Sequence, residues 1–417
     1  MSQRNFHRRR ATQKRRRESR ASTTSRDLRK ARGGDAVRSN CEEAEEFRGY
    51  VSKWVDERLM PVAEELDEAG TFPMELTREL ADLGFLGTMY SEEAGGSGLE
   101  NPNLCFAILC EELARASVGF AAGICMQGST ATHTLHEWGN DNLRETYFAP
   151  ALLGEKIAAF AITEPNAGSD AASIRTRATK VDGGWKLKGS KIFTTNGTVA
   201  DFITVVATTD PEQGGPALEM FVVDTRWDGF HVGRKLDKFS VRCSDTAELS
   251  FDDVYVPDDH MLGSGQGGGF RNAYRALTVD RIFTAALAVG NARGAYDATV
   301  RHSQERSQFG KPIGKFQAVE FRLVDIYAHV QTAALHTYAA AQMADRDEDI
   351  TVSAALAKLV AGNAGNAACQ EAMSVFGGYG LMQEYPAQRY LRDSHFPMIG
   401  GGTPDIMHKI IAKQLGH

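Results

Sequence analysis

Several common sequence signatures are absent from these 417 residues. The six cysteines form no CxxC pair and share no zinc-like spacing with histidine, and the eleven histidines include no HExxH pattern. We therefore expect no metal site, and we expect buried free thiols in a reducing compartment such as the cytoplasm. No apolar run approaches the roughly eighteen residues that a bilayer-spanning helix needs. The composition therefore predicts a soluble protein that does not enter a membrane.

Positive charge is concentrated at the N-terminus. Residues 1–40 contain twelve Arg and two Lys against three acidic residues, whereas the rest of the chain has a formal net charge of −18. Large apolar side chains are almost missing from this segment, so it cannot bury enough surface to offset the entropy of ordering. We expect a disordered basic extension at residues 1–40. An inert extension is our first interpretation and a tether to nucleic acid or another anionic surface our second. A transit peptide fits the Arg/Ser bias but lacks an apolar helical face.

Hydrophobic periodicity divides the remaining chain into three parts. From 41 to 156, apolar residues recur every three or four positions, which predicts an all-α domain. From 157 to 262 the period becomes two, and the turn signals at 182–184 and 214–216 predict an antiparallel β domain. From 270 to 417, helical segments with alanine-rich seams predict a four-helix bundle. The predicted fold class is therefore α+β, with a helical domain on each side of the β domain.

A glycine-rich segment at 263–269 separates the last two domains. Its first six residues, GSGQGG, match the GxGxxG spacing of dinucleotide-binding sites. The match is not preceded by a buried parallel strand and is not flanked by alternating strands and helices. We interpret this segment as an interdomain linker.

The stretch AFAITEPNAGSD, residues 159–170, marks the change from the first domain to the second. Residues 160–162 predict a buried strand, and Pro165, which has no N–H donor, cannot continue it. Gly168 permits a positive φ, and free backbone N–H groups and hydroxyls in this turn can hold a polar or anionic ligand. The local pattern alone favours a simple hairpin corner capped by Ser169.

Six motifs occur in an order that resembles the acyl-CoA dehydrogenase family, from about residue 43 to the C-terminus. They are AITEPNAGSDAASIRT (161–176), KIFTTNG (191–197), SDTAELSFDDVYVP (244–257), ERSQFGKPIGKFQ (305–317), FGGYG (376–380) and EYPAQRYLRD (384–393). Two further segments, at 233–239 and 400–407, look closest to the long-chain and isovaleryl-like branch. The resemblance implies bound FAD, an acyl-CoA substrate, an electron-transferring flavoprotein as acceptor and a homotetramer. Under this interpretation a nucleic-acid partner is not expected.

The resemblance also implies a reaction. A carboxylate removes the α-proton of the thioester, the β-hydrogen passes as hydride to the flavin, and hydrogen-bond donors on the thioester oxygen stabilise the developing enolate. Three alternatives stay open. The chain could be another flavin enzyme on this scaffold, namely an acyl-CoA oxidase, a desulfinase or a monooxygenase. It could be a non-catalytic member that binds acyl-CoA or FAD. In a different class, it could be a platform that the basic tail attaches to nucleic acid.

The resemblance assigns the FAD contacts to three groups of residues. The flavin ring is expected against Phe160, Ile162, Thr163, Gly168, Ser169, Phe193, Thr194 and Thr195, with Ser169 also near the CoA arm. Trp is usual at position 193, so Phe193 keeps an aromatic face without an indole N–H. The FAD of a neighbouring subunit is expected near Arg306, Gln308, Phe309 and Gln317, and a guanidinium at 306 suits pyrophosphate. The remaining expected contacts are Ser374, where Gln is often found, Gly377, Gly378, Thr403 and Asp405.

The proton-abstracting carboxylate is missing from its usual place in the family. Many members carry Glu in a YEGT motif, where this chain reads GGGT at 400–403. Gly401 keeps a backbone N–H for the thioester oxygen, and Gly402 is expected beside the substrate. The long-chain and isovaleryl branch places Glu before an Arg on the first bundle helix, and the equivalent pair here is Asp280-Arg281. Asp280 is therefore the candidate base and Arg281 a substrate contact; the alternative is an Asp280 that is solvated or paired with Arg.

Overall fold

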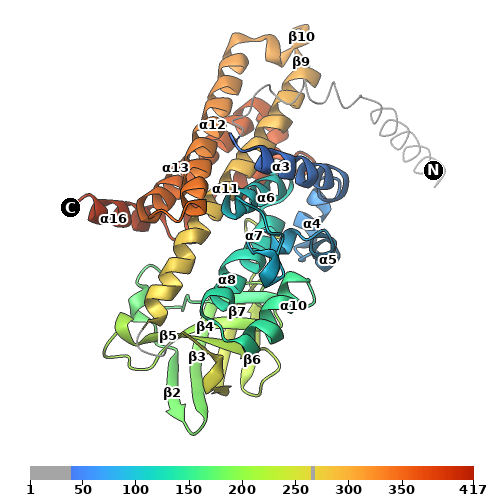
Figure 1. Ribbon diagram of the computed structural model, residues 1–417. Coiled ribbons are helices and arrows are strands. Elements are labelled where there is room, and N and C mark those ends of the chain that lie inside the picture. The colour runs from blue at the N-terminus through green and yellow to red at the C-terminus, as the bar shows by residue number, and fades with distance from the viewer. Residues whose placement is uncertain (1–38, 264–267) are drawn as a thin grey trace, which may run out of the picture. The chain divides into compact units, whose positions relative to one another are not determined.

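The computed structural model describes residues 39–263 and 268–417. The predictions made for residues 1–38, and for the middle of the glycine-rich segment at 264–267, lie outside the described residues. Within the described ranges, no helix combines the length and the apolar character that crossing a bilayer requires. One long helix, α11 (Gly269–Glu305), runs from the large sheet to the far end of the helical bundle (Figure 1).

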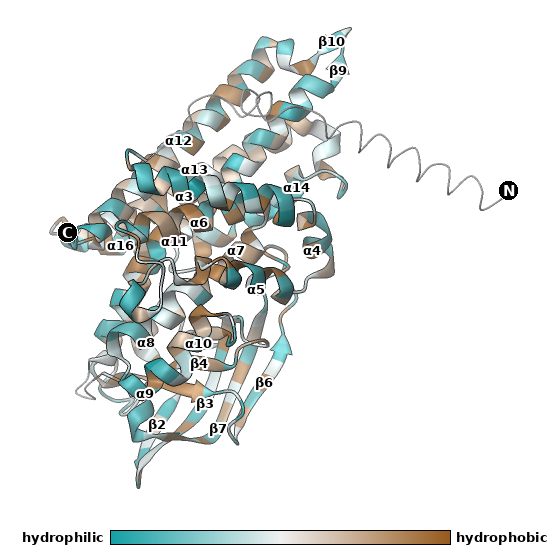
Figure 2. Ribbon diagram, turned by 45° about the vertical axis from the view of Figure 1, so that its right-hand side comes forward, coloured by the Kyte–Doolittle hydropathy of each residue, from teal (hydrophilic) through white to brown (hydrophobic). Residues whose placement is uncertain are grey.

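The first helical region is built around α6 (Pro102–Ala116), in which every side chain from Leu104 to Ala116 is buried. A helix that is buried on all sides forms the centre of its region, and Figure 2 shows hydrophobic residues on α6 and hydrophilic ones along the outer helix α3. The other helical elements are α3 (Glu42–Trp54), α4 (Ala63–Ala69), α5 (Met74–Asp82), α7 (Val118–Met126), the π-helical turn η4 (Gln127–Ala131), α8 (Thr132–Trp138), α9 (Asp141–Leu143) and α10 (Ala149–Leu152).

The middle of the chain forms one large sheet with the strand order β6-β7-β3-β2-β4-β5-β8, and β1 pairs with β4 beside this path. The turn predicted from Asp182-Gly183-Gly184 is present, because Val181 lies opposite Gly184 and Gly183 has a φ of 70°. The strands are β1 (Ala158–Ala161), β2 (Arg177–Val181), β3 (Gly184–Thr195), β4 (Phe202–Thr208), β5 (Leu218–Asp224), β6 (Phe230–Lys235), β7 (Thr246–Pro257) and β8 (Met261–Leu262).

The expectation of a wholly antiparallel sheet is wrong in one respect. β1 runs parallel to β4, with Ala158 opposite Phe202, and Arg177 of β2 forms a parallel pair with Thr208 of β4. The turn after β1 and the β2–β3 hairpin together make the long connection that a parallel pair needs. Hydrophobic alternation predicts that a strand exists but does not specify the direction of its partner. The sheet is therefore mixed, although most of its pairs are antiparallel.

The last part of the chain is a helical bundle. α11 packs against α12 (Gln317–Asp345) and α13 (Thr351–Phe376), and α6 also packs against α11. α13 ends at Phe376, where Gly377 follows it with a φ of 58°. The final helices are α14 (Ala387–Asp393), α15 (Phe396–Ile399) and α16 (Pro404–Gln414), and α16 packs against α13. The α+β fold class predicted from the sequence is confirmed.

One cluster of buried residues joins the first helical region, the sheet and the bundle. It contains Ala131 of η4, Phe160 of β1 and Ala273 of α11, and Ile162 and Leu277 pack against it. The turn after β1, the end of α7 and the first third of α11 therefore meet in one place. The candidate active site lies on this junction.

Candidate active site

Asp280 projects from α11 toward the turn that follows α7. Thr130 donates from Oγ1 to Oδ1 of Asp280 at 2.7 Å. Ser129 donates to the same oxygen at 3.4 Å, and the Sγ of Cys125 donates to it at 3.6 Å. Thr284, one turn further along α11, donates to Oδ2 at 3.4 Å. Thr130 and Ser129 belong to the π-helical turn η4, a distortion that often occurs at functional sites. The donors hold the carboxyl group in one orientation.

The environment of Asp280 changes its acidity. Burial raises the pKa of this carboxyl group, while the hydrogen bonds from Thr130, Cys125 and Ser129 and the charge of Arg281 act in the opposite direction. The net pKa shift is upward. A carboxylate with a raised pKa is a stronger base, so it is better suited to accept a proton from a weakly acidic carbon.

The glycine turn at 400–402 lies directly against Asp280. Gly401 and Gly402 have φ values of 68° and 116°, which favour glycine. A Cβ atom on Gly401 would lie 3.5 Å from Oδ2 of Asp280 and 3.4 Å from Oγ1 of Thr284. The two residues that the sequence singled out for catalysis, 121 positions apart, are therefore neighbours, and a Cβ on residue 401 would be in van der Waals contact with the carboxylate.

Two cations border the same space. Arg281 is 3% exposed; its Nε donates to the carbonyl of Gly401 at 3.5 Å, and its guanidinium lies 4.9 Å from the ring centre of Tyr274. Lys358 of α13 is 2% exposed, and its Cε would be 3.4 Å from a Cβ on Gly401. Sequence reasoning missed Lys358. The only signal was a lysine within the alanine-rich segment 354–364, where a buried helix face has no reason to carry a charge.

The ammonium group of Lys358 holds the glycine turn in place. It donates to the carbonyl of Pro397 at 3.0 Å and to the carbonyl of Gly402. The pKa of Lys358 is lowered to about 7, mainly by burial and also by the charge of Arg281, while the charge of Asp280 opposes the shift. The amine therefore titrates near neutral pH, an unusual value for lysine.

The turn after β1 is clamped by one buried ion pair. The Nζ of Lys191 donates to Glu164 at 2.8 Å and to the carbonyl of Ile162 at 3.0 Å. The same carboxylate accepts from the backbone N–H groups of Arg175 and Thr176, each at 2.8 Å. Burial lowers the pKa of Lys191 to about 8, against the attraction of Glu164. Sequence reasoning placed neither partner of this pair in the site, although both lie within the motifs that it used.

The expected flavin residues in this turn differ in exposure. Phe160 is buried, Ile162 and Thr163 are half-buried, and Gly168 and Ser169 are exposed. The region beyond the Cα of Gly168 is open, since a Cβ there would meet nothing within 4 Å. Gly168 does not use the positive φ that a glycine permits. The turn closes instead through paired backbone hydrogen bonds between Glu164 and Ala167, which leave Gly168 free to adopt ordinary angles.

A β-bulge presents Phe193. The register between β3 and β7 shifts between Lys191 and Thr194, and Phe193 has a φ of 59°, which is rare for an aromatic residue. Phe193 is 64% exposed, whereas Thr194 is buried with an unpaired hydroxyl and Thr195 is half-buried. Strain of this kind is found at binding sites, where the surrounding structure enforces it. Asn196 anchors the strand end by donating to the carbonyls of Gly123 and Ala158.

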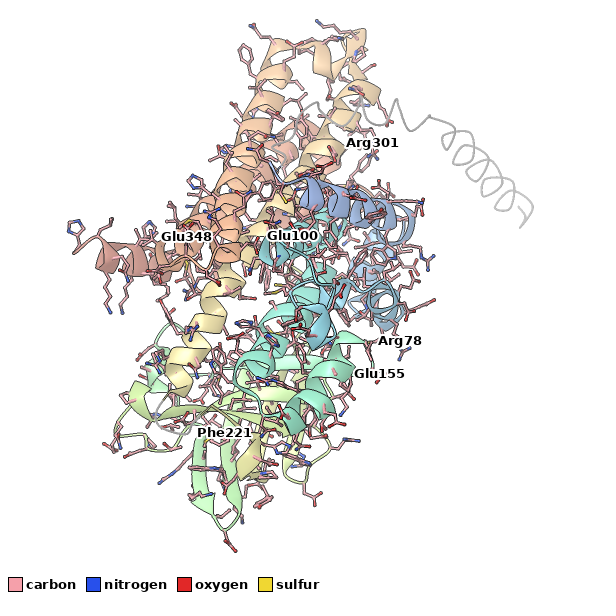
Figure 3. All side chains as sticks on the ribbon, viewed as in Figure 1. Arg78, Glu100, Glu155, Phe221, Arg301 and Glu348 are labelled. Carbon is pink, nitrogen blue, oxygen red and sulfur yellow. The ribbon has the colours of Figure 1, made fainter. Side chains whose placement is uncertain are left out.

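The second group of expected FAD residues lies far from Asp280 in the same chain. Arg306 follows the end of α11, which puts it about 39 Å from Asp280 at 1.5 Å per helical residue. Figure 3 labels Arg301 in the upper part of α11, far from Phe221 in the sheet. The hairpin β9 (Ser307–Gln308) and β10 (Lys311–Pro312) presents Phe309, which is 93% exposed with a φ of 51°. One FAD cannot touch both groups within a single chain.

The remaining expected contacts divide between these two places. Ser374 is exposed, but its hydroxyl donates to the carbonyl of Gln370 at 3.2 Å. Gly377 and Gly378 are exposed beside Tyr379, whose ring lies 4.9 Å from the guanidinium of Arg306. Thr403 and Asp405 stand at the start of α16, next to the glycine turn. No cluster of three or more potential metal ligands occurs among residues 39–263 and 268–417.

The exposed groups fit a flavin cofactor. Phe193 and Phe309 are large aromatic residues that water would otherwise surround, and the backbone around Gly168 is open. Arg306 adds a cation at the second place, where a pyrophosphate could bind. These features match the chemistry of FAD, which has an aromatic ring system at one end and phosphates in its middle.

Comparison with known proteins identifies the class. Acyl-CoA dehydrogenase N-terminal, middle and C-terminal domain models match residues 41–155, 159–254 and 267–416. The chain therefore belongs to the acyl-CoA dehydrogenase family. It is an FAD-dependent oxidoreductase that converts an acyl-CoA thioester to its α,β-unsaturated form.

Three similar proteins illustrate the range of the family. Benzylmalonyl-CoA dehydrogenase of Aromatoleum aromaticum is 42% identical over 374 residues, which are 90% of this chain and 98% of that protein. The structure of butyryl-CoA dehydrogenase from Megasphaera elsdenii is 36% identical, covers 91% of this chain and 100% of its own, and has a TM-score of 0.88. A structure named for the electron transferring flavoprotein of Acidaminococcus fermentans is 34% identical over 91% of this chain and 99% of its own, also with a TM-score of 0.88.

Proposed function

We propose that Asp280 is the base that removes the α-proton of the acyl-CoA substrate. The observation that carries this proposal is the 3.5 Å separation between Oδ2 of Asp280 and the position of a Cβ on Gly401. A carboxylate from α11 thus stands where the side chain of residue 401 would begin. The raised pKa of Asp280 and its donors from η4 supply the basicity and orientation that proton abstraction requires.

Gly401 contributes its backbone rather than a side chain. No backbone acceptor for its N–H occurs among the described residues, whereas Gly400 and Gly402 donate to Phe396 and Ile399. This free donor lies beside Asp280, where the thioester oxygen would gain negative charge as the proton leaves. When bound, FAD supplies the acceptor for the β-hydride. Phe193 and the turn after β1 would hold the flavin ring, with Thr403 and Asp405 near the glycine turn.

The proposal is tested with an Asp280→Asn variant mixed anaerobically with a panel of acyl-CoA thioesters. We expect loss of flavin bleaching, because an amide cannot accept the proton, while the protein retains bound FAD. Asp82→Asn, an exposed substitution on α5, is the control and should bleach like the unmodified protein. Bleaching at the normal rate by Asp280→Asn would exclude this residue as the base. Oxygen consumption without an enoyl-CoA product would instead favour an oxidase or monooxygenase.

We further infer a homotetramer in which Arg306, Gln308, Phe309 and Gln317 reach the FAD of another subunit. The support is the exposure of Phe309 and the length of α11, which separates this group from the chain's own Asp280. Electron-transferring flavoprotein is the proposed electron acceptor, and the similarity to a structure named for such a flavoprotein supports this choice. Six free thiols are consistent with the proposed cytoplasmic location.

The acyl group is the part of the substrate that differs among similar proteins. One relative is named for benzylmalonyl-CoA, whose malonyl unit carries a second carboxyl group, and another is named for butyryl-CoA, which has none. Both kinds of acyl group are candidates for this chain.

A further inference from the structure

The catalytic junction holds more buried positive charge than negative charge. Arg281 and Lys358 are both almost fully buried, and they contact backbone carbonyls, the hydroxyl of Thr278 and the ring of Tyr274. Among the residues that the structure describes, neither forms a salt bridge with a carboxylate. The nearest acidic group is Asp280, and its pKa is raised. A single carboxylate cannot balance two cations.

Unpaired buried cations are unfavourable, because desolvation is not offset by an opposite charge. The lowered pKa of Lys358 reports the same penalty. Neutral acceptors use only two of the three donors of its ammonium group, the carbonyls of Pro397 and Gly402. One donor therefore stays available for a ligand.

The Cα of Gly401 faces both the lysine and the proposed base. A Cβ on Gly401 would be 3.4 Å from Cε of Lys358 and 3.5 Å from Oδ2 of Asp280. The same small volume is thus bordered by the proposed base and by the lysine. Since the α-carbon must approach Asp280, a substrate group that binds Lys358 can be only one or two bonds from that carbon.

We propose, building on the role proposed for Asp280, that Lys358 and Arg281 bind a second carboxylate of the substrate. The substrate class is an acyl-CoA with a carboxyl group on the α- or β-carbon, of the malonyl or succinyl type. The absence of a side chain at Gly401 makes room for this carboxylate. The guanidinium of Arg281 is a planar hydrogen-bond donor, and the ammonium group of Lys358 is a compact charge. Together they are suited to bind the two oxygens of a carboxylate.

The test compares malonyl-CoA with acetyl-CoA as ligands of the FAD-loaded enzyme, with binding measured by calorimetry. These thioesters differ only by the carboxylate, and neither has a β-hydrogen, so neither can be dehydrogenated. We expect malonyl-CoA to bind at least about tenfold more tightly, because a charge-assisted contact in a buried site is strong. Lys358→Met should remove the difference between the two affinities. The exposed control Lys413→Met should keep the difference.

The comparison of malonyl-CoA with acetyl-CoA on the unmodified enzyme tests the proposal by itself. The test therefore remains valid if the Lys358→Met protein fails to fold. Equal affinity for malonyl-CoA and acetyl-CoA would overturn the proposal. Preferential binding of glutaryl-CoA over malonyl-CoA and succinyl-CoA would also overturn it, because the carboxylate would then lie further from the α-carbon. These binding measurements involve no proton abstraction, so they test the carboxylate site alone. The role of Asp280 as the base is tested separately, by flavin bleaching in Asp280→Asn.

Discussion

The substitution Gly401→Ala distinguishes two roles of this residue. One is the backbone conformation of the glycine turn, and the other is the absence of a side chain beside Asp280. Gly401 has a φ of 68°, and an alanine in this left-handed region costs about 1–2 kcal/mol. The new methyl group would meet Lys358, Thr284 and Asp280 at 3.4–3.5 Å, which is ordinary van der Waals contact without a clash. The expected loss of folding stability is therefore only the backbone term.

The expected loss of activity is much larger. A methyl group 3.5 Å from Oδ2 of Asp280 occupies the volume through which the α-carbon must approach the base. A displacement of the reacting carbon by about 1 Å can reduce the rate by about 100-fold. We therefore expect a fall of this order in kcat/KM for an acyl-CoA.

Flavin reduction in a stopped-flow instrument, together with thermal unfolding, measures the two effects. Gly70→Ala is the matched control, because Gly70 has a φ of 60° and lies at the end of α4, away from the junction. It should lose similar stability and keep full activity. Normal flavin reduction by Gly401→Ala would refute the argument that substrate enters this volume.

Three further predictions follow from individual contacts. Thr130→Val removes the shortest hydrogen bond to Asp280, which favours the charged form; the pKa of Asp280 should rise, and the acid limb of the pH profile of kcat/KM should move to higher pH. Thr332→Val on α12 is its control, and an unchanged profile would contradict the role of Thr130. Lys191→Met leaves Glu164 buried without its cation and should lower the free energy of unfolding by about 3–5 kcal/mol. The control Lys186→Met should lower it by at most about 1 kcal/mol, the size of one hydrogen bond. A loss of only about 1 kcal/mol in Lys191→Met would contradict the prediction. Phe309→Ala should leave the fold intact but increase FAD dissociation from the oligomer, whereas the equally apolar change Phe239→Ala should not; equal FAD retention would argue against a contact between subunits.

The order of the helical and β regions was predictable because it depends on local patterns. Period changes and turn residues are properties of short segments, so the hairpin at Gly183 followed from the sequence. The parallel pairing of β1 with β4 did not, since register and direction depend on which strands meet in space. The closure of the turn after β1 by the backbone hydrogen bonds between Glu164 and Ala167 was likewise not predictable from the local pattern.

The candidate site shows the same division. Resemblance drew attention to Asp280 and Gly401, and the structure places them side by side. The resemblance gave no reason to consider Lys358, Thr130 or Cys125. Thr130 and Cys125 donate to Asp280, which is more than a hundred positions away in the sequence. Lys358 donates to Gly402, some forty positions further along the chain. A single sequence contains no measure of such proximity. The buried lysine on an alanine-rich helix was visible, but only the packing of α13 against the glycine turn shows what it contacts.

Placing the base on α11 rather than on the glycine turn changes what each element can do. A helix buried between α6, α12 and α13 holds Asp280 rigidly, and donors from η4 fix its carboxyl group. The glycine turn no longer carries an acid, so its backbone can adopt positive φ and leave the N–H of Gly401 free. With no acid on the turn, the carboxylate that interacts with Arg281 and Lys358 is that of Asp280. In the roles proposed for them, Arg281 and Lys358 would therefore favour a substrate that brings its own carboxylate.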